Sequence, residues 1–456
     1  MDYFMLLADR AASLQGKPFL YVDEEQYSYA AFLAIVEKKA QELLRLAGAD
    51  GICGDVLVLA DSFLAQAVLF FAVQKNGARP ILLHHGLTAE EVGAIARENA
   101  LELFVGENGE KLEIQRFSRP SDRPETADCL GVLSSGTTGV PKVMHRTFES
   151  WAGFFPVQNK IFRVKEDSVL FLHGSLSFTG NMNTFLAVLF AGGTVCTSRR
   201  TAVKSWLSLL GRGAIDVVYL VPAKLRLLME ALAANGGRLP AVKSLFAGSQ
   251  LISAPLLELL REKLPNARIL LYYGASELNY ITYADCTDGV RDERNLGRPF
   301  PGVELSFRDG TIYVDTRFHV SGLKTPFTLR DKGHPNARGE LIFEGRAQAW
   351  VNKGGYKISL ERLELKIKGV AGVRDAAVLS VEDEARGAEI AAFVVREESV
   401  PEAELRRRIR HALEPIEMPR GLLFCGAIPL NDRGKTATRI LLEKWEKVRS
   451  EERPPA

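Results

Sequence analysis

Hydrophobic and polar positions along the chain follow two different periods, and each period predicts a different kind of element. Between Ser28 and Leu46 the residues Phe32, Val36, Ala40 and Leu43 recur at three- and four-residue spacing. This spacing places them on one face of a helix, so we expect an amphipathic helix over these residues. Short, continuous apolar runs bounded by glycine or polar residues instead predict buried strands.

Strands and helices alternate through most of the chain. The segment DVLVLADSFLAQAVLFFAVQKNGARPILLHHG predicts a strand at Val56–Leu59, a helix that ends near Gly77, and a second strand at Ile81–Leu83. The same alternation predicts further strands at Val217–Leu220, Ser244–Ala247 and Ile269–Tyr273. It predicts helices between them at Lys224–Leu232 and Ala254–Leu264. Such alternation is typical of α/β proteins, in which helices cover mainly parallel sheets.

The pattern changes near residue 340. The segment GELIFEGR predicts a strand that ends at Gly345-Arg346. A helix, two strand-like runs and another helix are then expected, at Leu360–Ile367, Asp375–Val381, Glu389–Val395 and Glu402–Leu413. These elements suit a compact α+β domain of roughly 110 residues. We therefore predict a large domain at residues 1–346 and a small one at 347–456, with the boundary near Ala347–Trp350.

Composition and charge exclude several classes of function. The 456 residues carry a formal net charge of +2, so no overall field would attract nucleic acid or an anionic membrane. The five cysteines are scattered without a CxxC pair, which disfavours a zinc site and suits a reducing compartment. The N-terminal MDYFMLLADRAASLQ lacks a basic region, and no apolar run reaches the length of a membrane span. We expect a cytoplasmic protein without a nucleic-acid partner.

A glycine- and hydroxyl-rich loop, LSSGTTGVPKVMH at residues 133–145, is the first candidate for chemistry. Glycines let successive backbone N–H groups converge on an anion, and hydroxyl groups and Lys142 add donors. The loop follows a predicted strand end at Gly131–Leu133, where ligands bind in open α/β sheets. The composition alone allows a phosphate-binding loop or a surface linker. Its glycine spacing excludes the Walker pattern, and the chain has no GxGxxG.

The loop and five later motifs, taken in order, resemble those of the acyl-adenylate-forming (AMP-binding) superfamily. This group includes acyl-CoA synthetases, nonribosomal adenylation domains and firefly luciferase. The resemblance covers essentially the whole chain, and the later motifs are YYGASE (272–277), NLGRPFPGVE (295–304), TLRDKG…GELIFEGR, VNKGGYKISLERLE and PLNDRGKTATRIL. Three departures stand out: Ser276 replaces the usual threonine, Leu329-Arg330 precedes Asp331 in place of T-G, and Asn431 replaces a threonine in the last motif.

The resemblance implies a reaction in two steps. A carboxylate attacks the α-phosphate of ATP, which forms acyl-AMP and pyrophosphate, and a thiol then attacks the acyl carbon. We expect ATP and CoA as co-substrates, Mg²⁺ as cofactor and a small-molecule carboxylate as the acid. The first rival is a stand-alone enzyme that loads the acyl group onto an acyl carrier protein. A non-catalytic nucleotide-binding scaffold is a rival from another class.

The resemblance also implies which residues bind the phosphates. Ser135, Thr137, Thr138 and Lys142 would hold the β- and γ-phosphates, with Thr138 counted among the catalytic residues. Glu277 would ligate Mg²⁺ and act in catalysis, since a carboxylate is a suitable ligand for this ion. Ser276 keeps the hydroxyl of the usual threonine and would contact phosphate. The alternative for Glu277 is an ordinary acidic residue at a helix N-terminus.

The resemblance also implies which residues bind the nucleoside part of ATP. Asp331 would accept the ribose hydroxyls, and Arg346 would assist at ribose and phosphate. Tyr273 would stack on the adenine, although it can also be an ordinary core residue. The adenine would be framed by Gly248, Ser249 and Gln250.

The resemblance also implies that the small domain rotates between the two steps, and it assigns roles to three residues of this domain. Lys435 would reach the carboxylate and α-phosphate during adenylation, although a lysine in such a loop is often only solvated. Gly355 would leave a tunnel for the pantetheine arm of CoA. Gln348 would be the hinge of a mobile domain. Family members usually carry Asp or Lys at the hinge.

The segment SLSFTGNMNTFLAVLFAGGTV, residues 175–195, resembles the lining of the acyl pocket. Phe178 resembles its aromatic gate, and Thr179 stands where amino-acid-activating members carry an aspartate. Burial of an ammonium group without an anion is costly, so we expect a non-amino acid as substrate. Thr179, Met182 and Asn183 would share a small, partly polar helix face, which favours a short or functionalised acid. Alternatively, these residues only pack. The resulting prediction is an AMP-forming acyl-CoA ligase.

Overall fold

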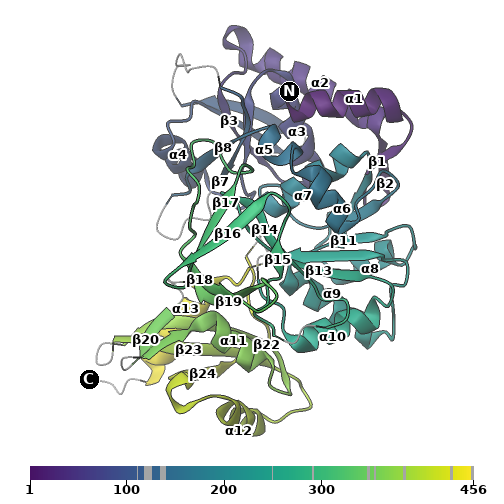
Figure 1. The fold of residues 1–456 in the computed structure, drawn as a ribbon. Helices are drawn as coiled ribbons and strands as arrows, with labels where there is room; N and C mark the ends of the chain where they lie inside the picture. The colour runs from purple at the N-terminus through teal and green to yellow at the C-terminus, as the bar shows by residue number, and fades with distance from the viewer. Residues whose placement is uncertain are drawn as a thin grey trace.

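The computed structural model describes residues 1–109, 111–117, 126–133, 140–248, 250–289, 292–346, 350–353, 356–383, 387–431 and 435–452. Along much of the chain, helices alternate with strands (Figure 1). The α-helices are α1 (Tyr3–Leu14), α2 (Tyr29–Ala47), α3 (Phe63–Lys75), α4 (Ala89–Glu98), α5 (Glu149–Ala152), α6 (Phe155–Phe162), α7 (Thr179–Ala191), α8 (Val203–Leu210), α9 (Pro222–Ala234), α10 (Ala254–Lys263), α11 (Leu360–Lys368), α12 (Glu402–Ala412) and α13 (Thr438–Glu452).

The largest sheet in this part of the chain has nine strands, and its central strands are parallel. Strands β2, β14 and β15 run antiparallel to their neighbours at the edges. In spatial order the strands are β15 (Arg298–Pro299), β14 (Asn279–Asp285), β13 (Arg268–Ala275), β12 (Ser244–Gly248), β11 (Val217–Tyr219), β9 (Val169–Leu172), β10 (Thr194–Thr197), β1 (Pro18–Val22) and β2 (Glu25–Ser28). The α/β class and the mainly parallel arrangement expected from the sequence are therefore confirmed.

A six-stranded sheet contains the first strand–helix–strand unit predicted from the sequence. The predicted strands are β3 and β4, which pair in parallel and are joined by α3. The parallel core is flanked by antiparallel β6 and β8. In spatial order the strands are β6 (Lys111–Arg116), β5 (Leu103–Asn108), β3 (Asp55–Ala60), β4 (Arg79–Leu82), β7 (Asp128–Leu133) and β8 (Val143–Thr147).

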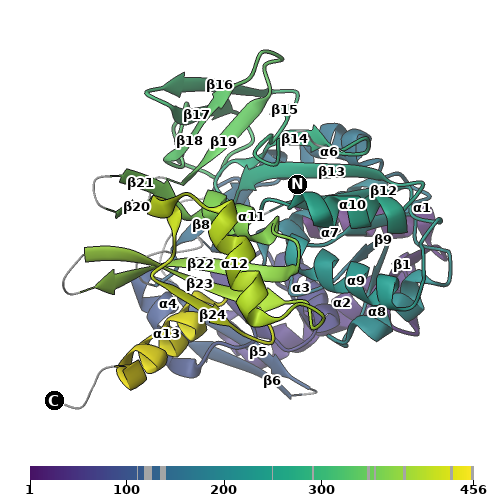
Figure 2. The same cartoon turned by 90° about the horizontal axis from the view of Figure 1, so that it is seen from below.

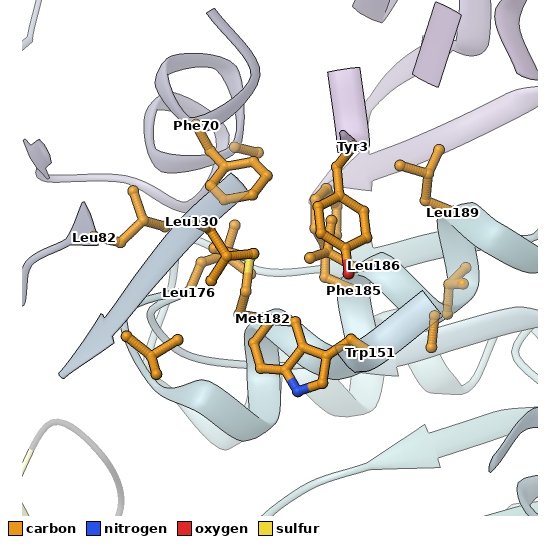
Figure 3. Close-up of a cluster of buried hydrophobic side chains, with 14 of the residues drawn as sticks. Tyr3, Phe70, Leu82, Leu130, Trp151, Leu176, Met182, Phe185, Leu186 and Leu189 are labelled. Carbon is orange, nitrogen blue, oxygen red and sulfur yellow. The ribbon is translucent and has the colours of Figure 1, made fainter. Parts of the chain in front are cut away.

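Two helices with apolar residues on all sides join these sheets in one core. Helix α3 packs on β3 and β4, α7 packs on β10, and α1 contacts both helices. A helix that is apolar all round is stable in water only when every face is covered. Figure 3 shows the resulting cluster, where Tyr3, Phe70, Trp151 and Phe185 come together from four helices.

An antiparallel four-stranded sheet follows the large sheets and carries part of the candidate site. The sequence patterns predicted only its last strand. The first two strands alternate between buried and exposed residues, which is a weak signal in strands of six residues. The strands are β16 (Val303–Arg308), β17 (Thr311–Thr316), β18 (Asp331–Pro335) and β19 (Leu341–Arg346).

The elements from β20 onward form a separate layer at the end of the molecule opposite the N-terminus (Figures 1 and 2). Helices α11 and α12 pack with a three-stranded sheet through a hydrophobic cluster of their own, and α13 contributes to a second cluster. The strands are β20 (Trp350–Lys353), β21 (Tyr356–Ser359), β22 (Val373–Asp383), β23 (Gly387–Arg396) and β24 (Gly421–Phe424). The predicted domain boundary falls on residues 347–349, which lie outside the described residues, so it stays a prediction.

Among the helices that the structure describes, none is both long enough and apolar enough to cross a lipid bilayer.

Candidate active site

A short hairpin turn presents Ser276 and Glu277. Strands β13 and β14 pair antiparallel up to Ala275 and Asn279, so the three residues between them form the turn. Asn279 has φ 70°, a left-handed conformation that asparagine tolerates better than most residues. The backbone N–H of Val320 donates to the Glu277 carbonyl oxygen at 2.9 Å. This bond holds the backbone of the turn. The Glu277 side chain takes no part in it and supplies a carboxylate at the turn.

A buried arginine anchors the turn from below. Arg146 of β8 is 0% exposed, and its Nη2 donates to the Ser276 carbonyl oxygen at 2.7 Å. Its Nη1 lies 3.2 Å from the Ser150 hydroxyl oxygen, and its guanidinium stacks on the Trp151 ring. Burial lowers the pKa of Arg146 to about 10, against the opposing influence of nearby acidic groups that include Glu277. The guanidinium is still protonated at neutral pH, so it places a fixed positive charge beneath the Glu277 turn.

Asp331 and Tyr273 form the buried polar centre of the site. Asp331 begins β18 and is 3% exposed, and the Tyr273 hydroxyl donates to its Oδ2 at 2.5 Å. Burial raises the pKa of Asp331 above its ordinary value, while the Tyr273 hydroxyl and Arg346 act in the opposite direction and Glu277 adds to the rise. Burial and Asp331 also raise the pKa of Tyr273 well above its ordinary value. Tyr273 therefore stays protonated and acts as a donor.

Arg346 connects this centre with the C-terminal elements. It ends β19, and its Nε lies 4.0 Å from Asp331 Oδ1 and 3.7 Å from Glu361 Oε1. Its backbone N–H also donates to Glu361 Oε2 at 3.1 Å. Glu361 is in the first turn of α11, and burial raises its pKa while Arg346 opposes the rise. One guanidinium therefore lies between two carboxyl groups from different parts of the chain.

The predicted acyl-pocket residues lie at the start of α7, beside the same hairpin. Phe178 is the N-cap residue of α7. The Thr179 hydroxyl lies 2.9 Å from the Ser276 hydroxyl, and Asn183 contacts Asn279 at 3.4 Å. Met182 is 4% exposed and points into the hydrophobic core (Figure 3). The structure thus brings Thr179 and Asn183 to the hairpin and leaves Met182 in the core.

The remaining predicted residues are dispersed or lie outside the described part. Gly248 ends β12 against the ring of Tyr272, and Gln250 follows shortly after. Lys142 is exposed just before β8, and the backbone N–H of Lys435 donates to Asn431 Oδ1 at 3.0 Å in the loop before α13. The residues outside the described ranges are Ser135, Thr137, Thr138, Ser249, Gln348 and Gly355.

Two family models match the chain. The AMP-binding enzyme model matches residues 110–317, which contain the hairpin, and the AMP-binding enzyme C-terminal domain model matches residues 363–435. The chain belongs to the adenylate-forming (AMP-binding) superfamily. It is an adenylate-forming ligase, and enzymes of this kind use ATP.

Relatives of this adenylate-forming enzyme differ in the thiol that their names imply. An uncharacterized acyl-CoA ligase, YhfT of Bacillus subtilis, is 28% identical over 346 residues, which is 72% of this chain and 70% of that protein. A 3,4-dihydroxybenzoate–[aryl-carrier protein] ligase of Bacillus anthracis is 24% identical over 92% of this chain and 98% of that protein. Both names are those of ligases, while the acceptor that they name differs.

A solved structure shares the fold of this adenylate-forming enzyme. O-succinylbenzoate coenzyme A synthetase (MenE) of Bacillus subtilis, in complex with ATP and a magnesium ion, superposes with a TM-score of 0.78. The superposition covers 96% of this chain and 99% of that chain, at 18% sequence identity. At this identity the likeness establishes the fold alone.

Sequence reasoning did not assign roles to Arg146, Glu361 or Asn279. Glu361 lies within the motif VNKGGYKISLERLE, so its position was available in the sequence. Arg146 offered a weaker signal, an arginine within a strand beside buried apolar segments. Asn279 acquires its role only from its left-handed conformation at the end of the hairpin turn.

Proposed function

We propose that this enzyme is an AMP-forming acyl-CoA ligase for a non-amino carboxylic acid. The observation that carries the proposal is the arrangement of Tyr273, Asp331 and Arg346 beside the turn that bears Glu277. Asp331 is a carboxylate acceptor suited to the vicinal hydroxyls of a ribose, and Arg346 is a cation suited to phosphate. Hydroxyl groups from ATP would offset the burial that disfavours ionised Asp331.

Glu277 fits a magnesium ion that arrives with ATP. Mg²⁺ usually keeps several waters and binds through one or two carboxylates and the phosphates of the substrate. Glu277 is half-buried, and it has no hydrogen bond or ion pair through its carboxylate within the described residues. Those residues also contain no group of three or more His, Cys, Asp or Glu side chains suited to a metal. Bound there, Mg²⁺ would neutralise charge that develops on the phosphates.

The chain's own residues would then orient the reactants. The loop with Ser135, Thr137 and Thr138, together with Lys142, would donate to the β- and γ-phosphates. Ser276 would add a hydroxyl at the turn. These fixed donors act where negative charge grows during attack by the carboxylate, which is the main source of rate enhancement in phosphoryl chemistry.

The small domain would serve both steps in turn. Lys435 would supply positive charge at the α-phosphate during adenylation, and Gly355 would leave room for pantetheine during thioester formation. The hinge at Gln348 would let one active site carry out both reactions. Residues 347–456 would form this mobile domain.

The proposal also specifies the kind of acid and the thiol that accepts the acyl group. Thr179, in place of an aspartate, supports a non-amino acid, because a buried ammonium group would lack its anion. The name of the Bacillus subtilis relative favours CoA as acceptor. The name of the aryl-carrier-protein relative supports the second candidate, a ligase that loads a carrier protein.

Pyrophosphate exchange with ATP, measured over a panel of carboxylic acids, tests the first step. We expect clear exchange with at least one non-amino acid and weak exchange with every standard amino acid. Strong exchange with an amino acid would contradict the assignment of Thr179. With the best acid, thioester formation is then compared between free CoA and a set of acyl and aryl carrier proteins. Transfer to a carrier protein alone would reverse the choice of acceptor.

A further inference from the structure

A cluster of buried polar side chains lies between α7 and the start of β14. Asn183 of α7 is 2% exposed and Asn279 of β14 is 5% exposed, and their side chains meet where Asn183 Nδ2 lies 3.4 Å from Asn279 Oδ1. The hydroxyls of Thr184 and Tyr280 lie close to each other nearby, and both residues are at most 4% exposed. Such a concentration of neutral polar groups is unusual inside a helix–sheet interface.

Besides the hydroxyl oxygens of Thr184 and Tyr280, two amide atoms of this cluster have no hydrogen-bond partner among the described residues. They are Asn183 Oδ1, an acceptor, and Asn279 Nδ2, a donor. Leaving a buried polar atom without a partner is unfavourable, so native proteins rarely retain one without a ligand, a water or a function. The amide pair thus offers one acceptor and one donor to a third group.

The cluster adjoins the face of α7 that is predicted to line the acyl pocket. Thr179 and Asn183 are four residues apart on α7, so they share one face of the helix about 6 Å apart along its axis. Thr179 meets the hairpin at Ser276, next to the proposed metal ligand, and Asn183 meets it at Asn279. The amide pair therefore lies about one helical turn further from the reacting end than Ser276.

Two tyrosine side chains limit the space beside the start of α7 and the end of β12. The hydroxyls of Tyr219 and Tyr272 are 2.9 Å apart, and a Cβ on Gly180 would lie 2.3 Å from the Tyr219 hydroxyl oxygen. A Cβ on Gly248 would lie 2.4 Å from the ring of Tyr272. Both tyrosines therefore lie directly over glycines, which leaves little room for a long alkyl chain beside them.

We propose that the acid activated by this enzyme is short and carries a neutral group that both donates and accepts hydrogen bonds, such as a hydroxyl, and that Asn183 and Asn279 recognise this group. The inference rests on the proposed function. The recognising groups are amides and hydroxyls, whereas a charged substituent would need a counter-ion to be buried there. A site built to bond a hydroxyl discriminates strongly against the analogue that lacks it.

The test compares acids that differ only by a hydroxyl group. Pyrophosphate exchange is measured with butyrate and γ-hydroxybutyrate, and with benzoate and its meta- and para-hydroxy derivatives. In at least one pair the unaltered enzyme should favour the hydroxylated acid by about tenfold or more in kcat/KM. Asn183→Leu keeps the number and branching of the side-chain heavy atoms and removes both polar atoms. It should lower kcat/KM for the hydroxylated acid by about tenfold more than for the plain acid.

A matched variant separates recognition from folding. Asn159→Leu removes another buried amide, which donates to the Ala187 carbonyl oxygen on the far part of α7, and should leave the ratio between paired acids unchanged. The inference would be overturned if Asn183→Leu lost equal activity with both acids, or if the unaltered enzyme showed no preference. The amide pair would then bind a structural water and not the substrate. The preference of the unaltered enzyme is measured even if the variant fails to fold. Absence of exchange with every acid would overturn the proposed function itself.

Discussion

Asp331 and Glu277 are two carboxyl groups of the candidate site, and their surroundings give them different properties. Asp331 is buried and held by the Tyr273 hydroxyl, and burial raises its pKa. Glu277 is half-buried on a turn, and its backbone, not its carboxylate, makes the contact that fixes it. The first arrangement suits a fixed acceptor for hydroxyl groups. The second leaves an anionic oxygen available to a cation.

Glu277→Gln keeps the shape of the side chain and removes its charge. We expect adenylation to fall by roughly 10²-fold or more, because the lost contact acts on charge that develops in the transition state. The measurement is pyrophosphate exchange as a function of Mg²⁺ concentration. Glu258→Gln, at an exposed position of α10, is the matched control and should retain full activity. Near-normal exchange by Glu277→Gln at ordinary Mg²⁺ would refute the metal assignment.

At the scale of elements, strand β8 has two polar residues that bond in different directions. Successive side chains of a strand point to opposite faces. His145 Nε2 therefore lies 3.1 Å from Asp55 Oδ1 on β3, while Arg146 donates to the Ser276 carbonyl oxygen on the hairpin. Arg79 of β4 donates to the same Asp55 oxygen at 2.7 Å. Asp55 thus ties three strands of the six-stranded sheet together.

The Asp55 cluster makes stability depend on pH. Although burial acts to raise the pKa of Asp55, hydrogen bonds from His145 and Arg79 outweigh it and lower the pKa from 3.8 to about 2. A lowered folded-state pKa stabilises the protein above the unfolded value, by ~2 kcal/mol here, and this contribution is lost as pH falls from about 4 through 2. Asp55→Asn should therefore be less stable than the unaltered protein at pH 7.

Urea unfolding of both proteins at several pH values checks this expectation. The difference in stability should shrink by roughly half between pH 6 and pH 3, since the carboxylate becomes protonated in the unfolded chain first. Glu113→Gln, at an exposed position of the edge strand β6 in the same sheet, is the control carboxylate substitution. A constant difference across this range would contradict the assigned role of Asp55.

At the scale of the whole molecule, ion pairs join α9 to the C-terminal elements. Arg374 of β22 donates to Glu230 at 2.6 Å, and Arg226 donates to the Arg374 carbonyl oxygen and lies 3.8 Å from Asp375. These contacts are polar and partly exposed, so each is worth little on its own. An interface of this kind can open and reform, as alternation between two steps would require.

Lys435→Ala and Gly355→Leu test that alternation with two assays on each variant. Lys435→Ala should lose acyl-AMP formation by about 10²- to 10³-fold yet still convert supplied acyl-AMP and CoA to thioester, because its charge is needed only at the α-phosphate. Gly355→Leu should retain pyrophosphate exchange and lose thioester formation, because its side chain would fill the tunnel. Equal loss of both activities in both folded variants would refute alternation.

Local patterns predicted many elements of the repeating strand–helix part. The helix expected at Ser28–Leu46 is α2, with Ser28 as its N-cap, and the strands expected at Val56–Leu59 and Ile81–Leu83 are β3 and β4. These elements bury continuous apolar faces, so their periods are visible in a few residues. Strands β16 and β17 were not predicted, because their pairing with one another, and not a strong local pattern, makes them strands.

The sequence by itself determined the family, the α/β class and the order of the motifs, because these depend on residue identity and on spacing along the chain. It also supplied Tyr273, Asp331, Arg346 and Glu277 as candidates. Only the tertiary structure decided which partners they have: Arg146 under the Ser276 carbonyl, Glu361 beside Arg346, and Asn279 facing Asn183. These pairs join residues that are 15 to 130 positions apart. Such contacts arise from the packing of sheets and helices, which no local period encodes.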